Sequence, residues 1–520
     1  MSSRKKHAVS LAAIVAAAIV LGGCAGDDAP SPDAAASGEP VSGGVLRVAE
    51  LAAPTGFDPA QVFSSTSMPI SLTGLYGQFV SGDPETGEYT CVLCEDFSTD
   101  DGGSTYTVVT REGLTFTDGT PFDAEAIKYN WDRLKEPALG SASAGIASQI
   151  DRIEIVDDRT ARLVMVEQTP NFPATVSIYS LQWIASPTAL EKGQEEFNRN
   201  PVGAGPFVFE SWTPNGALKL TRNPDYFDAP KPYLDGLEVT GVVDNAQRLN
   251  ALITGQVDLA LNAEAATFAE AESAGFSSVT YTFNGGVGFM LNTSAAPFDD
   301  VRARQALSYA LDLDGLSDAI TRGYPSAPET LFQEESAFYE DIPLQTHDPE
   351  RAQELFDELA AEGKPVDFSY ALFPGAQTVF DALQAQLSAY DNVTVTADSR
   401  DTSEQGVVGT TGDYDLLSSS LAFADAGSRL WASLHGDANR TNYSRIDDAE
   451  LNAALDAARD AADVGAQKAQ YRLVQERLAE VVPYILYQSY EVGAITSDDV
   501  HGVSVYGYTT PAADGIWLTS

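Results

Sequence analysis

Helix starts and strand-like runs alternate along this chain from residue 43 onward, and this alternation restricts the fold more than any other feature. Asp123, Asp244, Asp300 and Asp348 each precede a segment whose apolar residues recur at spacings of three and four, as on one helix face. Short apolar runs bounded by turn residues lie between these segments and predict strands. Strands and helices mixed in this way, without a fixed repeat period, predict α/β domains whose sheets are covered on both faces.

Local patterns predict individual elements. Residues 43–50 (GGVLRVAE), 414–420 (YDLLSSS) and the run VVPYILY read as strands, and residues 104–122 read as a hairpin with its turn at Asp118-Gly119. Gly203 and Gly205 are expected to permit tight turns, and residues 95–101 to form a turn. The residues expected on buried helix faces are Ile127, Trp131, Leu134, Leu249, Leu252, Ile253, Leu473, Val474 and Leu478.

The N-terminus predicts export and anchoring. Three basic residues are followed by the apolar residues 11–21, a run shorter than the roughly 20 residues that span a bilayer. The sequence LGGC that ends at Cys24 resembles the lipobox of bacterial lipoproteins, in which the cysteine is acylated. An ordinary secretory signal with an incidental cysteine is the alternative. Residues 25–42, rich in Ala, Asp, Pro, Ser and Gly, then predict a solvated tether that ends in a lipidated Cys24.

The charge balance excludes several partners. Residues 1–23 contain three basic residues and no acidic ones, so their removal takes the formal charge from −45 to −48. So acidic a surface repels nucleic acid and anionic lipid.

The mature chain has only His347, His435 and His501, and neither a G-x-S-x-G nor an H-E-x-x-H motif occurs. The sequence therefore predicts neither an enzyme nor a cofactor, and no nucleic-acid partner.

Cys91 and Cys94 stand three residues apart in the sequence CVLCEDF. Outside the cytoplasm such a pair is most simply a local disulfide, worth about 2 kcal/mol in the chain-entropy model. Free thiols and a redox function are the alternatives, and apart from Cys24 no further cysteine is present to complete a thiolate metal site.

Several motifs, taken in order, resemble one known family. They are GGVLRVAE with GFDPA, LYGQFV, REGLTFTDGTPFDAEAIKYNWDRL, PVGAGPFVFESW, RNPDYF, PYLDGLEV, LITGQVDLA and APFDDVRARQALSYALDLDGL. In this order and spacing the chain is similar to the family 5 extracellular solute-binding proteins of ABC importers, the group of the dipeptide- and oligopeptide-binding proteins. The similarity extends over the chain after the tether.

The resemblance implies a two-lobed periplasmic-binding-protein fold of class II, with a hinge and an additional domain on the first lobe. Lobe I would comprise residues 43–82, 202–286 and 488–520, the additional domain residues 83–201, and lobe II residues 287–487. Chain crossings near 286 and 488 would form the hinge, around which the lobes close on a ligand. We expect a monomer that lies on the outer face of the cell membrane or in the periplasm. It would deliver its ligand to a permease.

The resemblance also implies the ligand site. In the oligopeptide-binding members the loop after the strand at 414–420 holds an acidic residue that pairs with the peptide α-ammonium group, and Asp425 falls at that place. The backbone of Leu421, Ala422 and Phe423 would pair with the peptide main chain. The ligand-facing segment of lobe I corresponds to Phe63, Ser64 and Ser65, and Asn442 and Tyr443 are further candidates for the cleft. No metal ligand is predicted.

Two departures from the peptide-binding pattern keep alternatives open. Ala422 stands where these proteins typically have tryptophan, and residues 418–420 supply no basic side chain for the ligand carboxylate. Instead of pairing with a ligand ammonium group, Asp425 could be a solvated loop residue. Three alternative functions follow. The protein could be a receptor for a metal chelate of the nickel type, with His435 in the cleft, or a receptor for an oligosaccharide. It could also be a surface adhesin or a peptide-signal receptor.

Overall fold

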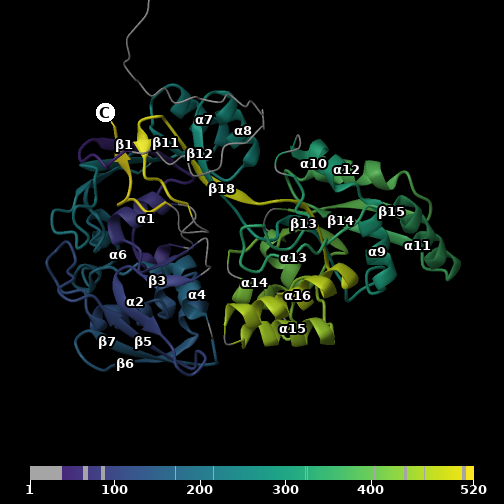
Figure 1. The fold of residues 1–520 in the computed structure, drawn as a ribbon, viewed down its shortest axis with the longest axis horizontal. Helices are drawn as coiled ribbons and strands as arrows, with labels where there is room; N and C mark the ends of the chain where they lie inside the picture. Colours follow the sequence, from purple (N-terminus) through teal and green to yellow (C-terminus); the bar gives the residue numbers. More distant parts are fainter. Residues whose placement is uncertain are drawn as a thin grey trace, which may run out of the picture. The chain divides into compact units, whose positions relative to one another are not determined.

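Strand β1 (Val45–Glu50) lies at the centre of a seven-stranded mixed sheet in the computed structural model (Figure 1). The strand runs parallel to β10 (Gly236–Gly241) on one side and to β11 (Leu259–Asn262) on the other. The sheet order is β12-β18-β11-β1-β10-β9-β8. The other strands are β8 (Phe207–Trp212), β9 (Leu218–Arg222), β12 (Ser277–Thr282) and β18 (Glu491–Thr496). Distant parts of the sequence therefore build one sheet.

Helices cover both faces of this sheet. Val48 enters a core shared with helix α1 (Pro69–Tyr76), whereas its neighbour Ala49 enters another core shared with α7 (Asn245–Ile253) and α8 (Ala265–Ser273). Successive strand residues point to opposite faces, so both faces of β1 are buried, as the sequence predicted. The short helices α5 (Pro187–Leu190) and α6 (Gln194–Arg199) lie next to each other in this part of the fold.

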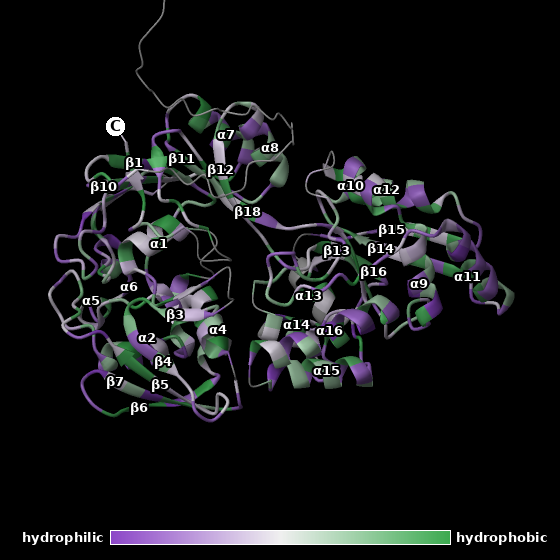
Figure 2. Cartoon of the chain, viewed as in Figure 1, coloured by the Kyte–Doolittle hydropathy of each residue, from purple (hydrophilic) through white to green (hydrophobic). Residues whose placement is uncertain are grey.

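A four-stranded antiparallel sheet, in the order β4-β5-β7-β6, forms a second body. Trp131 is fully buried beside it, its ring centroid 5.7 Å from that of Phe79 and 6.2 Å from that of Phe97, which confirms that Trp131 belongs to the core. Figure 2 shows hydrophobic residues along these strands. The elements are β4 (Cys94–Ser98), β5 (Thr105–Thr110), β6 (Ile150–Ile155), β7 (Thr160–Met165), α2 (Ala124–Arg133), α3 (Ala144–Ala147) and α4 (Phe172–Ile178), beside the ribbon of β2 (Val80–Gly82) and β3 (Tyr89–Cys91).

A five-stranded sheet follows, in the order β15-β14-β16-β13-β17. Its strands are β13 (Val287–Leu291), β14 (Val366–Leu372), β15 (Val393–Ser399), β16 (Leu416–Ser420) and β17 (Tyr484–Gln488). Phe289 and Met290 enter different cores, so this sheet too is buried on both faces. The helices are α9 (Val301–Ala310), α10 (Leu313–Thr321), α11 (Pro349–Ala361), α12 (Gln377–Leu387), α13 (Gln405–Thr411), α14 (Ala426–Leu434), α15 (Ala449–Arg459) and α16 (Val464–Val481).

The chain passes between the seven-stranded and the five-stranded sheet twice, at residues 283–286 from β12 to β13 and at residues 489–490 from β17 to β18. The Phe283 N–H donates to Tyr490 O (2.9 Å), so the two crossings lie side by side. After the second crossing, the C-terminal residues add the small ribbon of β19 (Val500–His501) and β20 (Trp517–Leu518).

The four predicted helix caps are confirmed. Asp123, Asp244, Asp300 and Asp348 accept from backbone N–H groups of the first turns of α2, α7, α9 and α11. An aspartate at this position satisfies an N–H group that has no partner within the helix and complements the positive end of the helix dipole.

Two of the predicted buried helix positions are wrong. Ile253 is 48% exposed and Leu473 is 47% exposed. Ile253 is the last residue of α7, one step beyond buried Leu252. In α16 the buried face passes through Tyr471, Val474 and Leu478, which leaves Leu473 about 100° away from Val474 around the helix.

The hairpin predicted for residues 104–122 is only partly correct. Strand β5 pairs with β4 and β7, while the turn at Asp118-Gly119 closes a single bridge between Thr115 and Pro121. Residues 95–98 belong to β4, so the predicted turn is wrong for them, whereas bends do occur at residues 100 and 101. Alternation of apolar residues identified the strand β5 but not its partners, because pairing depends on segments distant in sequence.

Gly203 and Gly205 have a role other than the predicted turns. Neither has a positive φ angle. A Cβ atom at Gly203 would collide with the carbonyl oxygen of Leu75, and one at Gly205 with that of Gly74. These glycines therefore allow the loop before β8 to approach the backbone of α1 closely.

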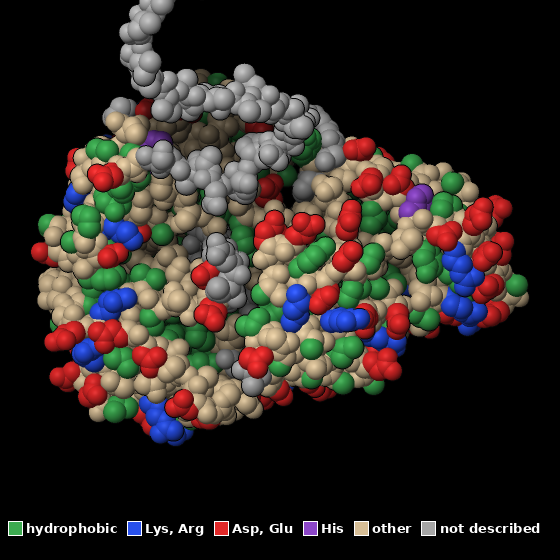
Figure 3. Space-filling view, viewed as in Figure 1, with side chains coloured by type: hydrophobic (Ala, Val, Ile, Leu, Met, Phe, Trp, Pro, Cys, Tyr) green, Lys and Arg blue, Asp and Glu red, His purple; other side chains and the backbone are tan. Residues whose placement is uncertain are grey.

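Residues 40–520 form one compact unit. The structure describes residues 38–62, 68–83, 88–169, 171–214, 216–321, 324, 326–401, 404–424, 426–438, 442–461, 463–505 and 511–519. None of these residues forms a helix with the length and apolar character that a membrane crossing requires. Figure 3 shows Asp and Glu side chains distributed over the visible face, as the formal charge of −45 requires.

Cys91 and Cys94 form a disulfide in the structure. The bond joins the end of β3 to the start of β4. Cys94 is fully buried and belongs to the core around Trp131. The disulfide therefore connects two short strands at the edge of this core.

Candidate functional site

The loop after β16 is the candidate ligand site. Strand β16 pairs with β14 and β13, and Leu416 and Leu417 enter the cores on the two sides of the sheet. The strand ends at Ser420, which is exposed. Ligands of α/β proteins collect beyond the carboxyl ends of strands. The residues that follow Ser420 therefore lie where a ligand is expected.

The backbone of residues 421–423 is hydrogen-bonded to the chain crossing. The Leu421 N–H donates to Gly286 O (2.8 Å) and the Phe423 N–H donates to Asn284 O (3.0 Å), while the Asn284 N–H donates back to Phe423 O (3.1 Å). The Ala422 N–H donates to Ser420 Oγ (3.2 Å). These backbone groups, which the resemblance assigns to a peptide main chain, are bonded within the protein in this structure.

The side chains of Leu421, Ala422 and Phe423 are each only 1% exposed. The Phe423 ring packs edge-to-face on Phe332, with ring centroids 5.5 Å apart. Leu421 lines an apolar void of about 10 Å³ together with Tyr484 and five other residues. These side chains fix the loop to the core beneath it.

The crossing is itself fixed from a second side. Gly285 has φ +68°, and a Cβ atom there would collide with the carbonyl oxygen of Leu421. Its N–H donates to Leu331 O (2.7 Å). Gln333 donates from its backbone to Asn284 Oδ1 (2.9 Å) and from its side chain to Phe283 O (3.1 Å). Loop, crossing and residues 331–333 thus form one hydrogen-bonded unit, which we call the crossing ladder.

Several predicted site residues lie outside the described residues. They are Cys24, Phe63, Ser64, Ser65 and Asp425. Their roles stay predictions.

The two later candidates lie in one loop between α14 and α15. The Asn442 side chain donates to His435 O (3.0 Å) and Ile446 O (2.7 Å) and accepts from Ser444 Oγ (2.9 Å). These bonds occupy the amide, so Asn442 stabilises the loop. Tyr443 is partly buried; its carbonyl accepts from the Tyr414 hydroxyl, and its ring lies against Gly409.

The segment just before Phe63 is held from two helices. The Arg133 guanidinium of α2 donates to both carboxylate oxygens of Asp58, each at 2.7 Å, and Asp58 is fully buried. From α6, Asn198 Oδ1 accepts from the N–H groups of Phe57 (2.7 Å) and Asp58 (2.9 Å). Burial lowers the pKa of the Arg133 guanidinium, but the bonds and charge of Asp58 outweigh this and raise it.

A second buried carboxylate lies at the carboxyl end of β1. Glu50 is fully buried and accepts from the Ser71 N–H (2.9 Å) and the Ser71 hydroxyl (2.6 Å) at the start of α1. Burial raises the pKa of Glu50 to about 7, and the donors from Ser71 oppose that rise. The group therefore titrates near neutral pH.

His435 is not placed to bind a metal from solution. Its side chain is 4% exposed and its ring stacks on Trp431, with ring centroids 4.6 Å apart. Its Nδ1 accepts from the Asp437 N–H (3.0 Å), and its Nε2 lies 3.4 Å from Asp456 Oδ2. In the described part of the chain, no group of three or more His, Cys, Asp or Glu side chains could hold a metal ion.

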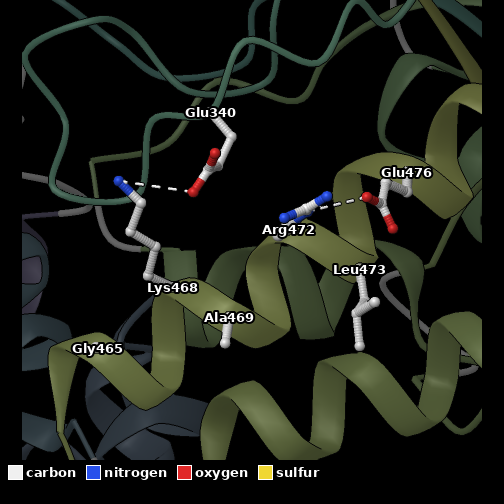
Figure 4. Close-up of a pocket in the computed structure, with 7 residues that line it drawn as sticks. All are labelled: Glu340, Gly465, Lys468, Ala469, Arg472, Leu473 and Glu476. Carbon is white, nitrogen blue, oxygen red and sulfur yellow. Dashed lines mark hydrogen bonds and ion pairs between the residues drawn. The ribbon is translucent and has the colours of Figure 1, made fainter.

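A surface cavity of about 550 Å³ lies on α16 (Figure 4). Lys468 pairs with Glu340 at 3.8 Å, and Arg472 pairs with Glu476 at 3.0 Å. The charges around the cavity compensate one another, and none of the predicted ligand residues lines it.

One charged residue at the carboxyl end of β16 is not among the predicted site residues. Arg429 donates from Nη2 to the carbonyl oxygen of Ser420 (2.9 Å). The signal that was available is its position, four residues after Asp425 and on a predicted ligand loop.

Comparison with known proteins identifies the class. The model of the bacterial extracellular solute-binding proteins, family 5, matches residues 88–440, more than half of the chain. The chain belongs to this family.

Three relatives illustrate the similarity. The glutathione-binding protein GsiB of Shigella flexneri is 30% identical over 351 residues, which cover 64% of this chain and 65% of the relative. The match thus spans less than two thirds of that relative's length. The structure of the periplasmic binding protein DppA of Helicobacter pylori, in complex with the peptide STSA, matches with TM-score 0.73 and 22% identity, over 92% of this chain and 99% of that one. NikA of Brucella suis, in complex with Fe(III)-EDTA, matches with TM-score 0.77 and 20% identity, over 92% and 100%. These similarities confirm the predicted α/β, two-lobed fold of periplasmic binding proteins.

Proposed function

We propose that this protein is the receptor of an ABC importer and captures a short peptide between its two lobes. Membership of the solute-binding family supports a binding function rather than an enzyme. The observation on which the peptide rests is the similarity to GsiB, a glutathione-binding protein by name. The peptide in the DppA complex is consistent with it.

In this proposal, the lobes are those that the sequence analysis delimits. Lobe I comprises residues 43–82, 202–286 and 488–520, the additional domain residues 83–201, and lobe II residues 287–487. The placement of the seven-stranded and five-stranded sheets, one on each side of the two crossings, supports this division. Closure removes water from the ligand, and the closed form docks on the permease.

Asp425 is the proposed partner of the peptide α-ammonium group. It follows the buried loop 421–423 at the carboxyl end of β16. Burying an ammonium without a counter-charge is costly, and removing one partner of a buried charge pair costs roughly 2 to 5 kcal/mol. Asp425→Asn is therefore expected to weaken peptide binding by roughly 30-fold to several thousandfold.

Calorimetry with two ligands tests this proposal. Ser-Thr-Ser-Ala and glutathione are titrated into the parent and into Asp425→Asn, each also in its N-acetylated form. The acetylated ligands lack the ammonium charge and should bind the parent weakly and respond little to the substitution. Equal affinity of parent and variant for the free amines would leave Asp425 as a solvated loop residue. No binding of either free amine by the parent contradicts the peptide assignment.

A metal chelate is the second candidate, because the fold matches NikA in its Fe(III)-EDTA complex. The burial of His435 beneath Trp431 argues against a histidine ligand in the described loop. Fe(III)-EDTA in the same titration separates the two candidates. Mass spectrometry of the ligand that copurifies with the native protein identifies the class directly.

Cys24 is the proposed membrane anchor. Its position after the apolar residues 11–21 supports acylation, and stable attachment takes more than one acyl chain. Cys24→Ser should release the protein from the membrane fraction and abolish lipid labelling. A variant that stays as firmly bound and as strongly labelled as the parent excludes this anchor.

A further inference from the structure

Arg429 brings a positive charge to the carboxyl end of β16. Helix α14 begins at Ala426, directly after the loop, and Arg429 lies in its first turns. Its Nη2 donates to the carbonyl oxygen of Ser420 (2.9 Å), so the guanidinium folds back over the end of the strand. Both Arg429 and Ser420 are exposed. The cation is therefore accessible at the end of the strand where ligands collect.

Among the described residues, carboxylates pair with comparable arginines, whereas none pairs with Arg429. Arg400, directly after β15, lies 2.6 Å from Asp398 and 2.9 Å from Asp413. Arg459 pairs with Asp456 at 3.4 Å and with Asp460 at 3.5 Å. Within the described residues, no carboxylate lies within 4 Å of the Arg429 guanidinium.

The hydrogen-bonding capacity of Arg429 fits an anionic ligand. A guanidinium has five N–H donors in a planar fork that matches the two oxygens of a carboxylate. The bond to Ser420 uses one of them and holds the fork in place. A guanidinium held in this way loses little conformational entropy when it forms a bidentate pair.

Tyr484 of β17 lies within the electrostatic reach of this charge. Burial raises the pKa of the Tyr484 hydroxyl, and the positive charge of Arg429 opposes the rise. Tyr484 lines the void beneath Leu421. The Arg429 charge therefore acts on the region directly below the loop.

We propose that Arg429 binds a carboxylate of the ligand, so that the protein selects ligands with a free carboxylate group. The assignment rests on the proposed peptide-binding function and names its specificity. It supplies the basic partner that residues 418–420 lack.

The assignment is tested by removing the charge of the ligand carboxylate and, separately, the charge of Arg429. Ser-Thr-Ser-Ala is titrated calorimetrically as the free acid and as the C-terminal amide, and glutathione as the free acid and as its dimethyl ester. The proteins are the full-length parent, Arg429→Gln, Arg429→Lys and Arg162→Gln. Arg162 of β7 is the matched control, since it is exposed and no carboxylate of the described residues lies within 4 Å of it. Thermal melting of each variant establishes that it is folded.

The parent should bind the free acids about 10- to 100-fold more tightly than the neutral forms, because hydrogen bonds to charged groups are worth about 1.5 to 3 kcal/mol. Arg429→Gln should remove this preference by weakening the acids and sparing the neutral forms. Arg429→Lys should retain part of the preference, since lysine keeps the charge and loses the fork. Arg162→Gln should behave as the parent.

Two results overturn the assignment and leave the peptide function standing. One is equal binding of acid and neutral forms by the parent. The other is an Arg429→Gln variant that weakens both forms by the same factor, which would assign Arg429 to holding the loop. A parent that binds no form of either peptide contradicts the proposed function and this assignment together.

Discussion

The Asp58–Arg133 pair should be among the most costly polar interactions to break in this protein. Both oxygens of the fully buried Asp58 carboxylate accept from the guanidinium at 2.7 Å, and the Arg133 side chain is 10% exposed. Unit charges about 4 Å apart attract by about 4 kcal/mol at an effective dielectric constant of about 20. Arg133→Met removes this attraction and leaves a carboxylate with no water around it.

The expected loss is roughly 3 to 5 kcal/mol in the free energy of unfolding of the part that contains α2 and residues 57–62. Asp58→Asn should cost less, because the amide oxygen still accepts from the Ala60 N–H and from one guanidinium N–H, and because Arg133 is partly solvated. The double variant Asp58→Asn with Arg133→Met should be more stable than the sum of the two single losses indicates.

Urea denaturation followed by tryptophan fluorescence, together with hydrogen exchange of residues 57–62, measures these losses. Arg199→Met is the matched control, since Arg199 pairs with Glu195 on the surface with side-chain exposures of 63% and 83%. It should leave stability unchanged within error. A loss below about 1 kcal/mol for Arg133→Met, or strictly additive losses in the double variant, would refute the reasoning.

Two further predictions concern groups buried elsewhere. Because the folded-state pKa of Glu50 is raised to about 7, the folded protein binds its proton more tightly than the unfolded chain, so this group should destabilise the fold as pH rises from about 4.5 to 7. The loss should be roughly 2 to 4 kcal/mol, and Glu50→Gln, which keeps the shape and the contacts to Ser71, should abolish it; equal pH dependence of parent and variant in denaturation experiments would contradict this. Replacing Cys91 and Cys94 with serine should lower thermal stability by about 2 kcal/mol and leave ligand affinity unchanged, whereas lost binding with unchanged melting would indicate a functional disulfide.

Local features of the fold were predictable from the sequence. Helix caps depend on one side chain and the next three residues, so Asp123, Asp244, Asp300 and Asp348 could be identified directly. Strand pairing was not predictable, because β5 pairs with segments before and after it and no local pattern specifies them. The need for glycine at position 203 was also not predictable, because it arises from close approach to the backbone of Leu75, which is distant in sequence.

The location of the candidate site stays a prediction, whereas the contacts of its residues in the folded chain differ from those expected. The strand composition and the family resemblance together indicated the loop after β16. The burial of Leu421 and Phe423 and the occupation of the Asn442 amide follow from tertiary packing, which the sequence pattern does not contain. Arg429 was missed because no local sequence pattern shows that, among the described residues, its guanidinium has no carboxylate within 4 Å; this is a property of the folded chain.

The crossing ladder determines where the protein can bend. Three backbone hydrogen bonds join residues 284–286 to residues 421–423, and two contacts from Gln333 reinforce them. Breaking them together would cost several kcal/mol, so any rotation of one sheet against the other leaves the ladder intact. In the proposed closure, the torsion would then fall at the ends of the ladder, next to Thr282 and beside Tyr490, where the Phe283 N–H donates to Tyr490 O. If the proposed function is correct, a ligand bound at the loop moves together with the crossing ladder, and its position in the loop then sets the angle of the proposed closure.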